Sequence, residues 1–150
     1  MFSKFIMMVG IAGSGKTTVA SKVAASLDDC LVVSSDAIRG KLYGDEAIQG
    51  DSGHVFQLME ERTIEALRAG RDVIYDATNV TAWRRQELLA KLPLEVEKIC
   101  LWVNVPVERA LQNNQMRERH VPEWVIHYQA KRLELPMLNE GWDAVYVITY

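Results

Sequence analysis

The chain has 150 residues, of which 49% are hydrophobic and 25% are charged, so it can bury a core of its own and has the composition of a globular protein. Its formal net charge of −3 argues against a general nucleic-acid coat protein, which needs a broad basic face, but it leaves room for a local basic pocket. We expect a single domain over residues 1–150, with Cys30 and Cys100 as buried, reduced thiols. We also expect a cytoplasmic location, because there is neither a signal-peptide pattern nor an apolar stretch long enough for a membrane span.

Uninterrupted apolar stretches alternate with stretches of helical spacing along the chain. The strands expected on this basis cover residues 4–10, 30–35, 72–79, 96–105 and 144–150, and the first two should be buried on both faces. Helices are expected after the first glycine loop, over about 56–70, over 83–92, from Pro106 onward and over 121–135. This order predicts an α/β fold with three layers, α/β/α, around a five-stranded parallel sheet. Ligands of such sheets bind at the carboxyl ends of the strands.

The first expected strand ends in a glycine-rich segment, GIAGSGKT at residues 10–17, which matches the pattern G-x-x-x-x-G-K-[ST] at every position. Glycines let successive backbone N–H groups converge on phosphate oxygens, and the helix that follows adds the positive end of its dipole. The lysine bridges the β- and γ-phosphates, and the threonine hydroxyl binds Mg²⁺. The segment therefore predicts an ATP site made by Gly10, Ala12, Gly13, Ser14, Gly15, Lys16, Thr17 and Thr18.

Asp36 and Arg39 follow the second expected strand, three residues apart on one face of a first helical turn. A carboxylate there can orient an acceptor hydroxyl and take its proton, and a guanidinium can bind a phosphate that the acceptor carries. The alternative is that Asp36 caps the helix, as Ser34 or Ser35 can also do, and that Arg39 is solvated. After a phosphate-binding loop, we favour the catalytic interpretation.

Asp76 ends the third expected strand, where P-loop proteins place a carboxylate near Mg²⁺ or its waters. Thr78 and Asn79 come next, and they either contact the acceptor or cap the following helix. Arg84 and Arg85 are expected on the solvated face of that helix.

Residues 113–136 are expected to form a helical lid. Arg117 and Arg119, which precede the expected helix start near Pro122, are candidates for closing over the triphosphate and offsetting the charge that builds during transfer. Three further groups of side chains are expected to have no catalytic role. We expect Lys131 and Arg132 on an exposed helix face, and Trp124, Val125 and Tyr128 in a core stripe. His54, His120 and His127 lack the spacing of metal ligands and are expected to be structural or surface residues.

Several segments, in this order over nearly the whole chain, resemble the polynucleotide 5′-hydroxyl kinases of phage and bacterial nucleic-acid repair: GIAGSGKTT, SSDAIRG, DATN followed by RR, RERHVPEWVI and EGWDAVYVI. The resemblance implies a kinase-type P-loop NTPase fold and transfer of the γ-phosphate of ATP to the 5′-OH end of RNA or DNA. It also implies that Asp36 is the general base, that Arg39 binds the phosphate 3′ of the terminal nucleotide, and that Arg117 or Arg119 is the lid arginine. Many members carry a fused phosphatase or ligase module, so this chain is either a stand-alone kinase or one domain of a repair enzyme.

Two alternatives stay open. A kinase for a nucleotide, a sugar or another phosphorylated or unphosphorylated metabolite would use the same Asp36 base, and the acidic net charge favours a small acceptor. An ATP-dependent switch or binding module would need no acceptor site, and Asp36 with Arg39 argues against it.

Overall fold

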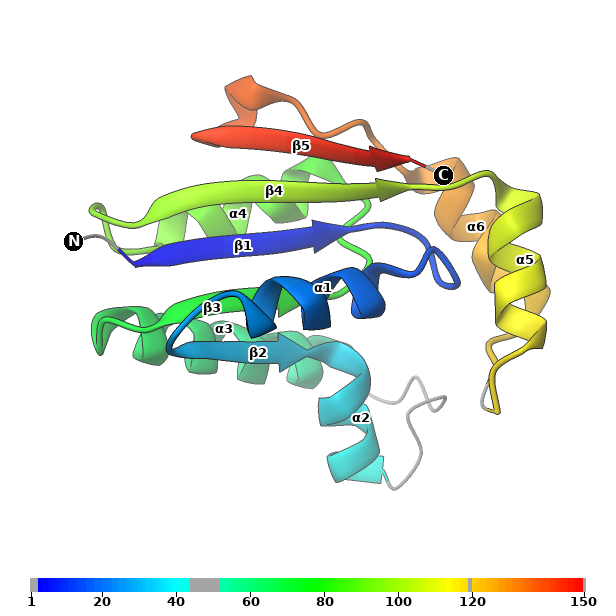
Figure 1. Cartoon of the computed structure of the whole chain (residues 1–150), viewed down its shortest axis with the longest axis horizontal. Coiled ribbons are helices and arrows are strands. Elements are labelled where there is room, and N and C mark those ends of the chain that lie inside the picture. Colours follow the sequence, from blue (N-terminus) through cyan, green and yellow to red (C-terminus); the bar gives the residue numbers. More distant parts are fainter. Residues whose placement is uncertain (1–2, 44–51, 119, 150) are drawn as a thin grey trace.

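The computed structural model describes residues 3–43, 52–118 and 120–149. At its centre lies a five-stranded sheet with the order β2-β3-β1-β4-β5, in which all neighbouring strands are parallel (Figure 1). The strands are β1 (Lys4–Val9), β2 (Cys30–Ser34), β3 (Asp72–Asp76), β4 (Glu97–Asn104) and β5 (Ala144–Thr149). The helices are α1 (Lys16–Ala25), α2 (Ser35–Tyr43), α3 (Ser52–Arg68), α4 (Ala82–Lys91), α5 (Val107–Gln115) and α6 (Glu123–Arg132), with a short 3₁₀ turn, η1, at Leu138–Glu140.

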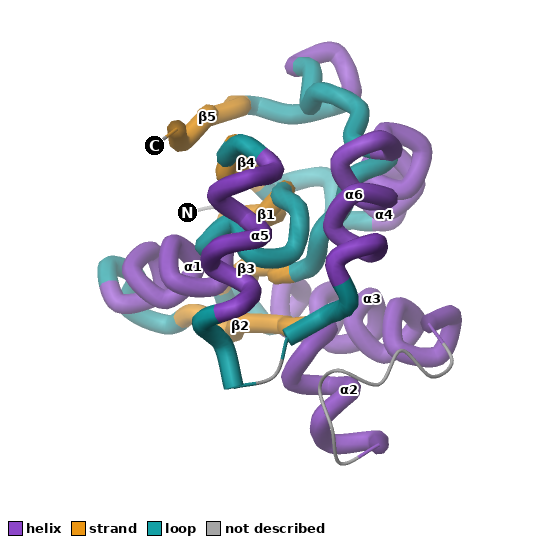
Figure 2. The backbone as a smooth tube through the Cα atoms, turned by 90° about the vertical axis from the view of Figure 1, so that its right-hand side faces the viewer, coloured by secondary structure: helices purple, strands orange, loops and turns teal. Residues whose placement is uncertain are grey.

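Helices cover both faces of the sheet, as the three-layer prediction requires (Figure 2). The alternation of side chains along β1 explains the two layers, because successive residues of a strand point to opposite faces. Phe5 and Met7 join one buried cluster with residues of α3 and α4, whereas Ile6 and Met8 join a second cluster with residues of α1, α5 and α6. Each of these side chains is at most 4% exposed, which contributes about 1.5–3 kcal/mol apiece to folding.

The prediction that the strand at 30–35 is buried on both faces is wrong. β2 is an outer strand of the sheet, and its Val32 side chain is 42% exposed because it faces an open pocket instead of a helix. Cys30 on the same strand is only half-buried, while Cys100 on β4 is fully buried, and both are free thiols.

The third expected strand ends three residues early, at Asp76. Asn79 has a φ of 49°, in the left-handed region that no strand residue adopts. Its side-chain amide donates hydrogen bonds to the backbone carbonyls of Met8, at 2.7 Å, and Ala77, at 3.2 Å. The polypeptide therefore turns sharply beyond β3 and is tied to the end of β1. None of the helices in the described part of the chain is both long and apolar enough to cross a membrane.

Candidate active site

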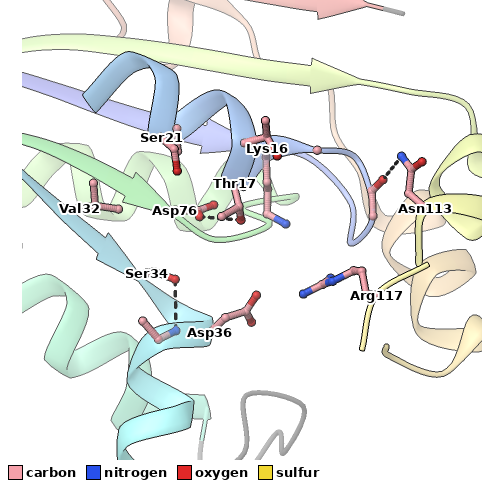
Figure 3. A pocket seen from close by; sticks show the side chains of 14 residues that line it. Lys16, Thr17, Ser21, Val32, Ser34, Asp36, Asp76, Asn113 and Arg117 are labelled. Carbon is pink, nitrogen blue, oxygen red and sulfur yellow. Dashed lines mark hydrogen bonds between the residues drawn. The ribbon is translucent and has the colours of Figure 1, made fainter. Parts of the chain in front are cut away.

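A pocket of about 700 Å³ lies at the carboxyl ends of β2 and β3, beside the start of α1 (Figure 3). This is the edge of the sheet where a parallel α/β fold is expected to bind its ligand. The residues that line the pocket come from the glycine-rich loop and α1, from β2 and α2, from the end of β3, and from α5 and the segment after it: Gly13, Gly15, Lys16, Thr17, Thr18, Ala20, Ser21, Val32, Ser34, Asp36, Ala37, Asp76, Asn113 and Arg117. The pocket thus brings together Lys16, Thr17, Asp36, Asp76 and Arg117, which the sequence had suggested from four separate segments.

The glycine-rich loop takes a conformation that its glycines make possible. Gly15 has a φ of 89° and forms the N-cap of α1 without any side-chain cap, so the first N–H groups of the helix stay available for an anion. Gly13 has a φ of 82°, and a Cβ atom at this position would overlap the backbone carbonyl of Ala110 on α5. The loop is therefore packed against α5 at a distance that only glycine permits.

Two amide side chains from α5 and α6 hold the glycine-rich loop in place. The Nδ2 atom of Asn113 on α5 donates a hydrogen bond of 2.8 Å to the carbonyl of Gly13, and the backbone N–H of Ala12 donates one of 2.8 Å to Oε1 of Gln129 on α6. Ala12 is one of the residues expected in the ATP site, and its N–H is instead bonded to Gln129 on α6. Gly10, Ala12 and Ser14 do not line the pocket, and the Ser14 hydroxyl is buried without a partner among the described residues.

Thr17 and Asp76 form a pair on the floor of the pocket. The Thr17 hydroxyl donates a hydrogen bond of 3.0 Å to Oδ2 of Asp76, while Oδ1 of the same carboxylate is buried with no partner among the described residues. Burial raises the pKa of Asp76, and the nearby negative charge of Asp36 adds to this, whereas the charge of Lys16 and the Thr17 hydrogen bond only partly oppose it. A carboxylate in this state favours a neighbouring cation.

The oxygen atoms of Thr17 and Asp76 fit a metal site that is completed by waters and phosphates better than one made only of protein ligands. No cluster of three or more His, Cys, Asp or Glu side chains occurs among residues 3–43, 52–118 and 120–149, so a cage built only from protein ligands is absent there. Mg²⁺ is commonly held by one or two protein oxygens together with waters and substrate phosphates. The Thr17 hydroxyl and the unpartnered Oδ1 of Asp76 suit that arrangement.

Asp36 and Arg39 lie on the first turns of α2 and form an ion pair with 3.6 Å between Nη1 and Oδ1. Arg39 is 8% exposed and its Nε atom is buried without a partner in the described structure. The backbone N–H of Ala37 donates a hydrogen bond of 3.2 Å to the Ser34 hydroxyl, so Ser34 caps α2 and Asp36 is not needed for that task. Figure 3 shows the Asp36 carboxylate directed into the pocket, toward the side occupied by Lys16 and Arg117.

Thr78 and Asn79 do not line this pocket; they line a second one on the other side of β3. The suggestion that Asn79 caps the following helix is wrong, because α4 begins at Ala82 after Thr81. Asn79 instead bonds to backbone carbonyls through its side chain, as described above. Of the two proposed lid arginines, Arg117 lines the first pocket, and Arg119 lies outside the described residues.

Two predictions for charged and aromatic side chains fail. Arg85 is not solvated: it is fully buried and paired with Glu140 on η1, with 2.8 Å between Nη2 and Oε2. Trp124 and Tyr128 on α6 are 68% and 51% exposed, and the core residue of that helix is Ile126. The expectation for Lys131 and Arg132 is confirmed, because both are exposed.

Comparisons with known proteins agree with the α/β fold described above. A family model described as an AAA domain matches residues 5–136, and no curated protein matches the chain with significance. A chain of the Pnkp1/Rnl/Hen1 RNA repair complex superposes with a TM-score of 0.78 at 22% identity, over 88% of this chain and 44% of that one. A sugar kinase from Janibacter sp. HTCC2649 superposes with a TM-score of 0.72 at 22% identity, over 98% of this chain and 85% of that one. A fungal RNA kinase superposes with a TM-score of 0.68 at 16% identity, over 98% of this chain and 38% of that one.

The chain spans less than half the length of the RNA-repair chain it resembles. At these levels of identity the superpositions establish the fold, and that fold is shared by a chain of an RNA repair complex, by an RNA kinase and by a sugar kinase. The family model matches most of the chain, residues 5–136, and this part contains strand β1, the glycine-rich loop and helix α1 in succession. The chain therefore belongs to the AAA domain family and has the fold of P-loop kinases.

Proposed function

We propose that the protein transfers the γ-phosphate of ATP to the 5′-hydroxyl end of RNA or DNA. The observation that carries the proposal is the Asp36–Arg39 pair, which combines a carboxylate at the phosphate pocket with a guanidinium 3.6 Å away. A switch or a hydrolase has no need for this pair, because water requires no anchor. An acceptor that carries a hydroxyl and its own phosphate uses both groups.

The donor side is supplied by the glycine-rich loop. The free N–H groups at the start of α1 and the Lys16 ammonium group would bind the β- and γ-phosphates of ATP. The residues that would hold Mg²⁺ are Thr17 and Asp76. When bound there, the ion neutralises charge on the phosphates.

The acceptor side is supplied by α2. Asp36 orients the 5′-hydroxyl and takes its proton as the bond from the hydroxyl oxygen to the γ-phosphorus forms. The bond between that phosphorus and the β–γ bridging oxygen breaks, and ADP leaves with the electron pair. In this proposal Arg39 binds the phosphate on the 3′ side of the same nucleotide through its guanidinium, which lies beside Asp36, although Arg39 is only 8% exposed and does not itself line the pocket.

The lid, proposed for residues 113–136, contributes positive charge opposite Asp36. Arg117 reaches the pocket from the segment after α5, and its guanidinium is directed inward (Figure 3). In the transition state this group would stabilise the negative charge on the transferring oxygens. We propose Arg117 as the lid arginine, with Arg119 as the alternative that the tests below include.

One observation favours a second candidate, a kinase for a small phosphorylated or unphosphorylated metabolite. The superposition with the sugar kinase from Janibacter sp. HTCC2649 spans 85% of that chain, whereas the one with the RNA-repair chain spans 44%. A small acceptor would occupy the same place beside Asp36. The two functions differ in what Arg39 must bind.

The deciding experiment is incubation with γ-labelled ATP, Mg²⁺ and a panel of acceptors. The panel contains 5′-OH oligonucleotides of RNA and DNA, nucleoside 3′-monophosphates, the matching plain nucleosides, and common sugars. We expect label on the oligonucleotides and on the nucleoside 3′-monophosphates, with the plain nucleosides poor acceptors. Equal rates on a nucleoside and its 3′-monophosphate would contradict the role of Arg39, and label on sugars alone would select the second candidate.

A further inference from the structure

A second pocket of about 650 Å³ lies on the opposite face of β3 from α1. Its walls come from α3, α4 and α6, which all lie on one side of the molecule in the view of Figure 2, and from the segment that follows β3. The donor and metal-binding chemistry described above uses none of this pocket. Its lining is unusual for a protein surface because it combines aromatic rings with arginines.

The aromatic side chains of this pocket are open to solvent. Trp83 on α4 is 68% exposed and Tyr128 on α6 is 51% exposed, while Phe56 on α3 is partly buried beside them. Pockets for small apolar ligands enclose their aromatic side chains. Indole and phenol rings that stay exposed on facing helices are instead suited to stacking against flat groups that enter from solvent.

The two arginines of the pocket are oriented by rings and not by carboxylates. The guanidinium of Arg84 lies 5.2 Å from the centre of the Phe56 ring, and that of Arg132 lies 5.5 Å from the centre of the Tyr128 ring and donates a hydrogen bond of 3.1 Å to its hydroxyl. Neither forms an ion pair with any carboxylate in the described part of the chain. Apart from the bond from Arg132 to the Tyr128 hydroxyl, their N–H groups have no carboxylate partner among the described residues and can bind phosphates.

The pocket also contains carboxylates. Glu60 and Glu87 line it, and their charges balance those of Arg84 and Arg132 in the same lining. Lys91 on α4 does not line the pocket, but it pairs with Glu60 at 3.2 Å and with Glu87 at 3.5 Å, so the carboxylates are held by a third cation and not by the two arginines. The arginines can therefore bind phosphates locally although the whole chain has a net charge of −3.

Both pockets adjoin the end of β3, on its opposite sides. Asp76 lines the first pocket and Thr78, two residues later, lines the second, although no described residue lines both. Two residues span at most about 7 Å. A chain molecule whose end reaches Asp36 would therefore have to pass over the end of β3 to enter the second pocket.

We propose that the second pocket is a binding groove for a single-stranded polynucleotide, in which bases downstream of the 5′ end stack on Trp83 and Tyr128 and their phosphates bind Arg84 and Arg132. This inference rests on the proposed function and deepens it, because it assigns the part of the acceptor beyond the first nucleotide. Stacking on exposed rings with arginines along the backbone is how single strands are held without sequence preference.

The test measures binding and catalysis separately. Binding of a 5′-OH decanucleotide with a 3′ fluorescein is followed by anisotropy without ATP, and kcat/KM is measured for the decanucleotide and for a nucleoside 3′-monophosphate. We expect Trp83→Ala to weaken decanucleotide binding about 5- to 150-fold, the range for loss of one base–aromatic stack, and to lower the ratio of the two kcat/KM values accordingly. Trp83→Phe should retain most of the wild-type ratio.

Matched controls are available within the chain. Tyr146 on β5 is 56% exposed and does not line the pocket, so Tyr146→Ala should keep the wild-type affinity. For the arginines, Arg132→Gln should reduce the slope of log Kd against log salt by about 0.7, the value for one phosphate contact on a single strand. Lys131→Gln, one residue earlier and outside the pocket, should leave that slope unchanged.

The outcomes separate the two proposals. Equal effects of Trp83→Ala and Tyr146→Ala, or unchanged binding in both, would overturn the groove while leaving 5′ phosphorylation intact. A decanucleotide that binds through Trp83 but receives no phosphate would support the groove and overturn the proposed function. A decanucleotide that neither binds nor reacts overturns both.

Discussion

The Thr17 hydroxyl donates a hydrogen bond of 3.0 Å to one oxygen of Asp76, and the other oxygen of that carboxylate is buried without a partner among the described residues. One oxygen of the carboxylate therefore has a hydrogen-bond donor in the protein, and the other has none among the described residues. Burial raises the pKa of Asp76 above its ordinary value. The site therefore has a stability cost in the absence of a cation.

Replacing Asp76 by Asn should stabilise the protein when no Mg²⁺ or nucleotide is present. Because the pKa of Asp76 is raised by folding, its ionisation destabilises the folded state, and this cost grows as the pH rises above about 3.9, the ordinary value for aspartate. At pH 7 we expect Asp76→Asn to melt at a higher temperature than the wild type, and the difference should vanish near pH 4. Thermal unfolding in chelator across this pH range measures it.

Mg²⁺ with ATP provides the matching control for Asp76→Asn. The ligand pair should raise the melting temperature of the wild type more than that of the variant, because a neutral amide is a poorer partner for the ion. A variant that is less stable than the wild type at pH 7 in chelator would contradict this account of the carboxylate.

Replacing Arg85 by Met should destabilise the fold by about 3–5 kcal/mol, the cost of leaving one member of a buried ion pair alone. Arg85 is fully buried, and it donates to both carboxylate oxygens of Glu140 and to two backbone carbonyls. Burial would raise the pKa of Glu140, but the hydrogen bonds from Arg85 and Trp142 hold it below its usual value. The stability that this pair provides should accordingly be lost as the pH falls below about 4.3, the ordinary value for glutamate.

Urea unfolding at pH 7 measures the effect of Arg85→Met. The adjacent Arg84 is exposed, so Arg84→Met should change the free energy of unfolding by no more than about 0.5 kcal/mol. A double variant, Arg85→Met with Glu140→Gln, should recover part of the loss because the uncompensated charge is gone. If Arg85→Met proved as mild as Arg84→Met, the pair would not hold η1 to α4.

The main features of the fold and of the donor site could be predicted because they are encoded locally. Alternating apolar and helical stretches determine a parallel sheet, and GIAGSGKT constrains its own backbone through Gly13 and Gly15, whose φ values of 82° and 89° need glycine. The same holds for Asp36 and Arg39, which three-residue spacing on α2 brings together.

The contacts that were missed join residues far apart in the sequence. Asn113 reaches Gly13 across 100 residues, Gln129 reaches Ala12 across 117, and Arg85 meets Glu140 across 55. No local pattern marks a polar side chain as the partner of a distant backbone group. Periodicity likewise could not distinguish a core stripe from an exposed one on α6, where Ile126 is buried and Tyr128 is not.

Replacing Arg117 by Ala should lower kcat about 10²- to 10³-fold, the loss seen when one donor to a transition-state charge is removed, with a smaller change in the affinity for ATP. Arg117 lines the first pocket, whereas Lys131 on α6 is exposed and does not line that pocket. Lys131→Ala should therefore keep wild-type kcat. Steady-state kinetics with Arg119→Ala in parallel decides between the two lid arginines: a full effect at Arg119 and none at Arg117 would reverse our assignment.

Replacing Asp36 by Asn should lower kcat about 10²- to 10⁴-fold, the range for loss of a general base, while ATP still binds. Asparagine keeps the shape of the side chain but cannot take the hydroxyl proton, and the helix start is unaffected because Ser34, not Asp36, caps α2. Calorimetric titration with ATP and single-turnover transfer to a 5′-OH oligonucleotide measure the two properties on the same preparation. Weakened ATP binding with unchanged transfer at saturation would assign Asp36 to the donor side, since the carboxylate also lies close enough to Asp76 to raise its pKa. Loss of transfer with intact ATP binding is the pattern expected of an acceptor-side base.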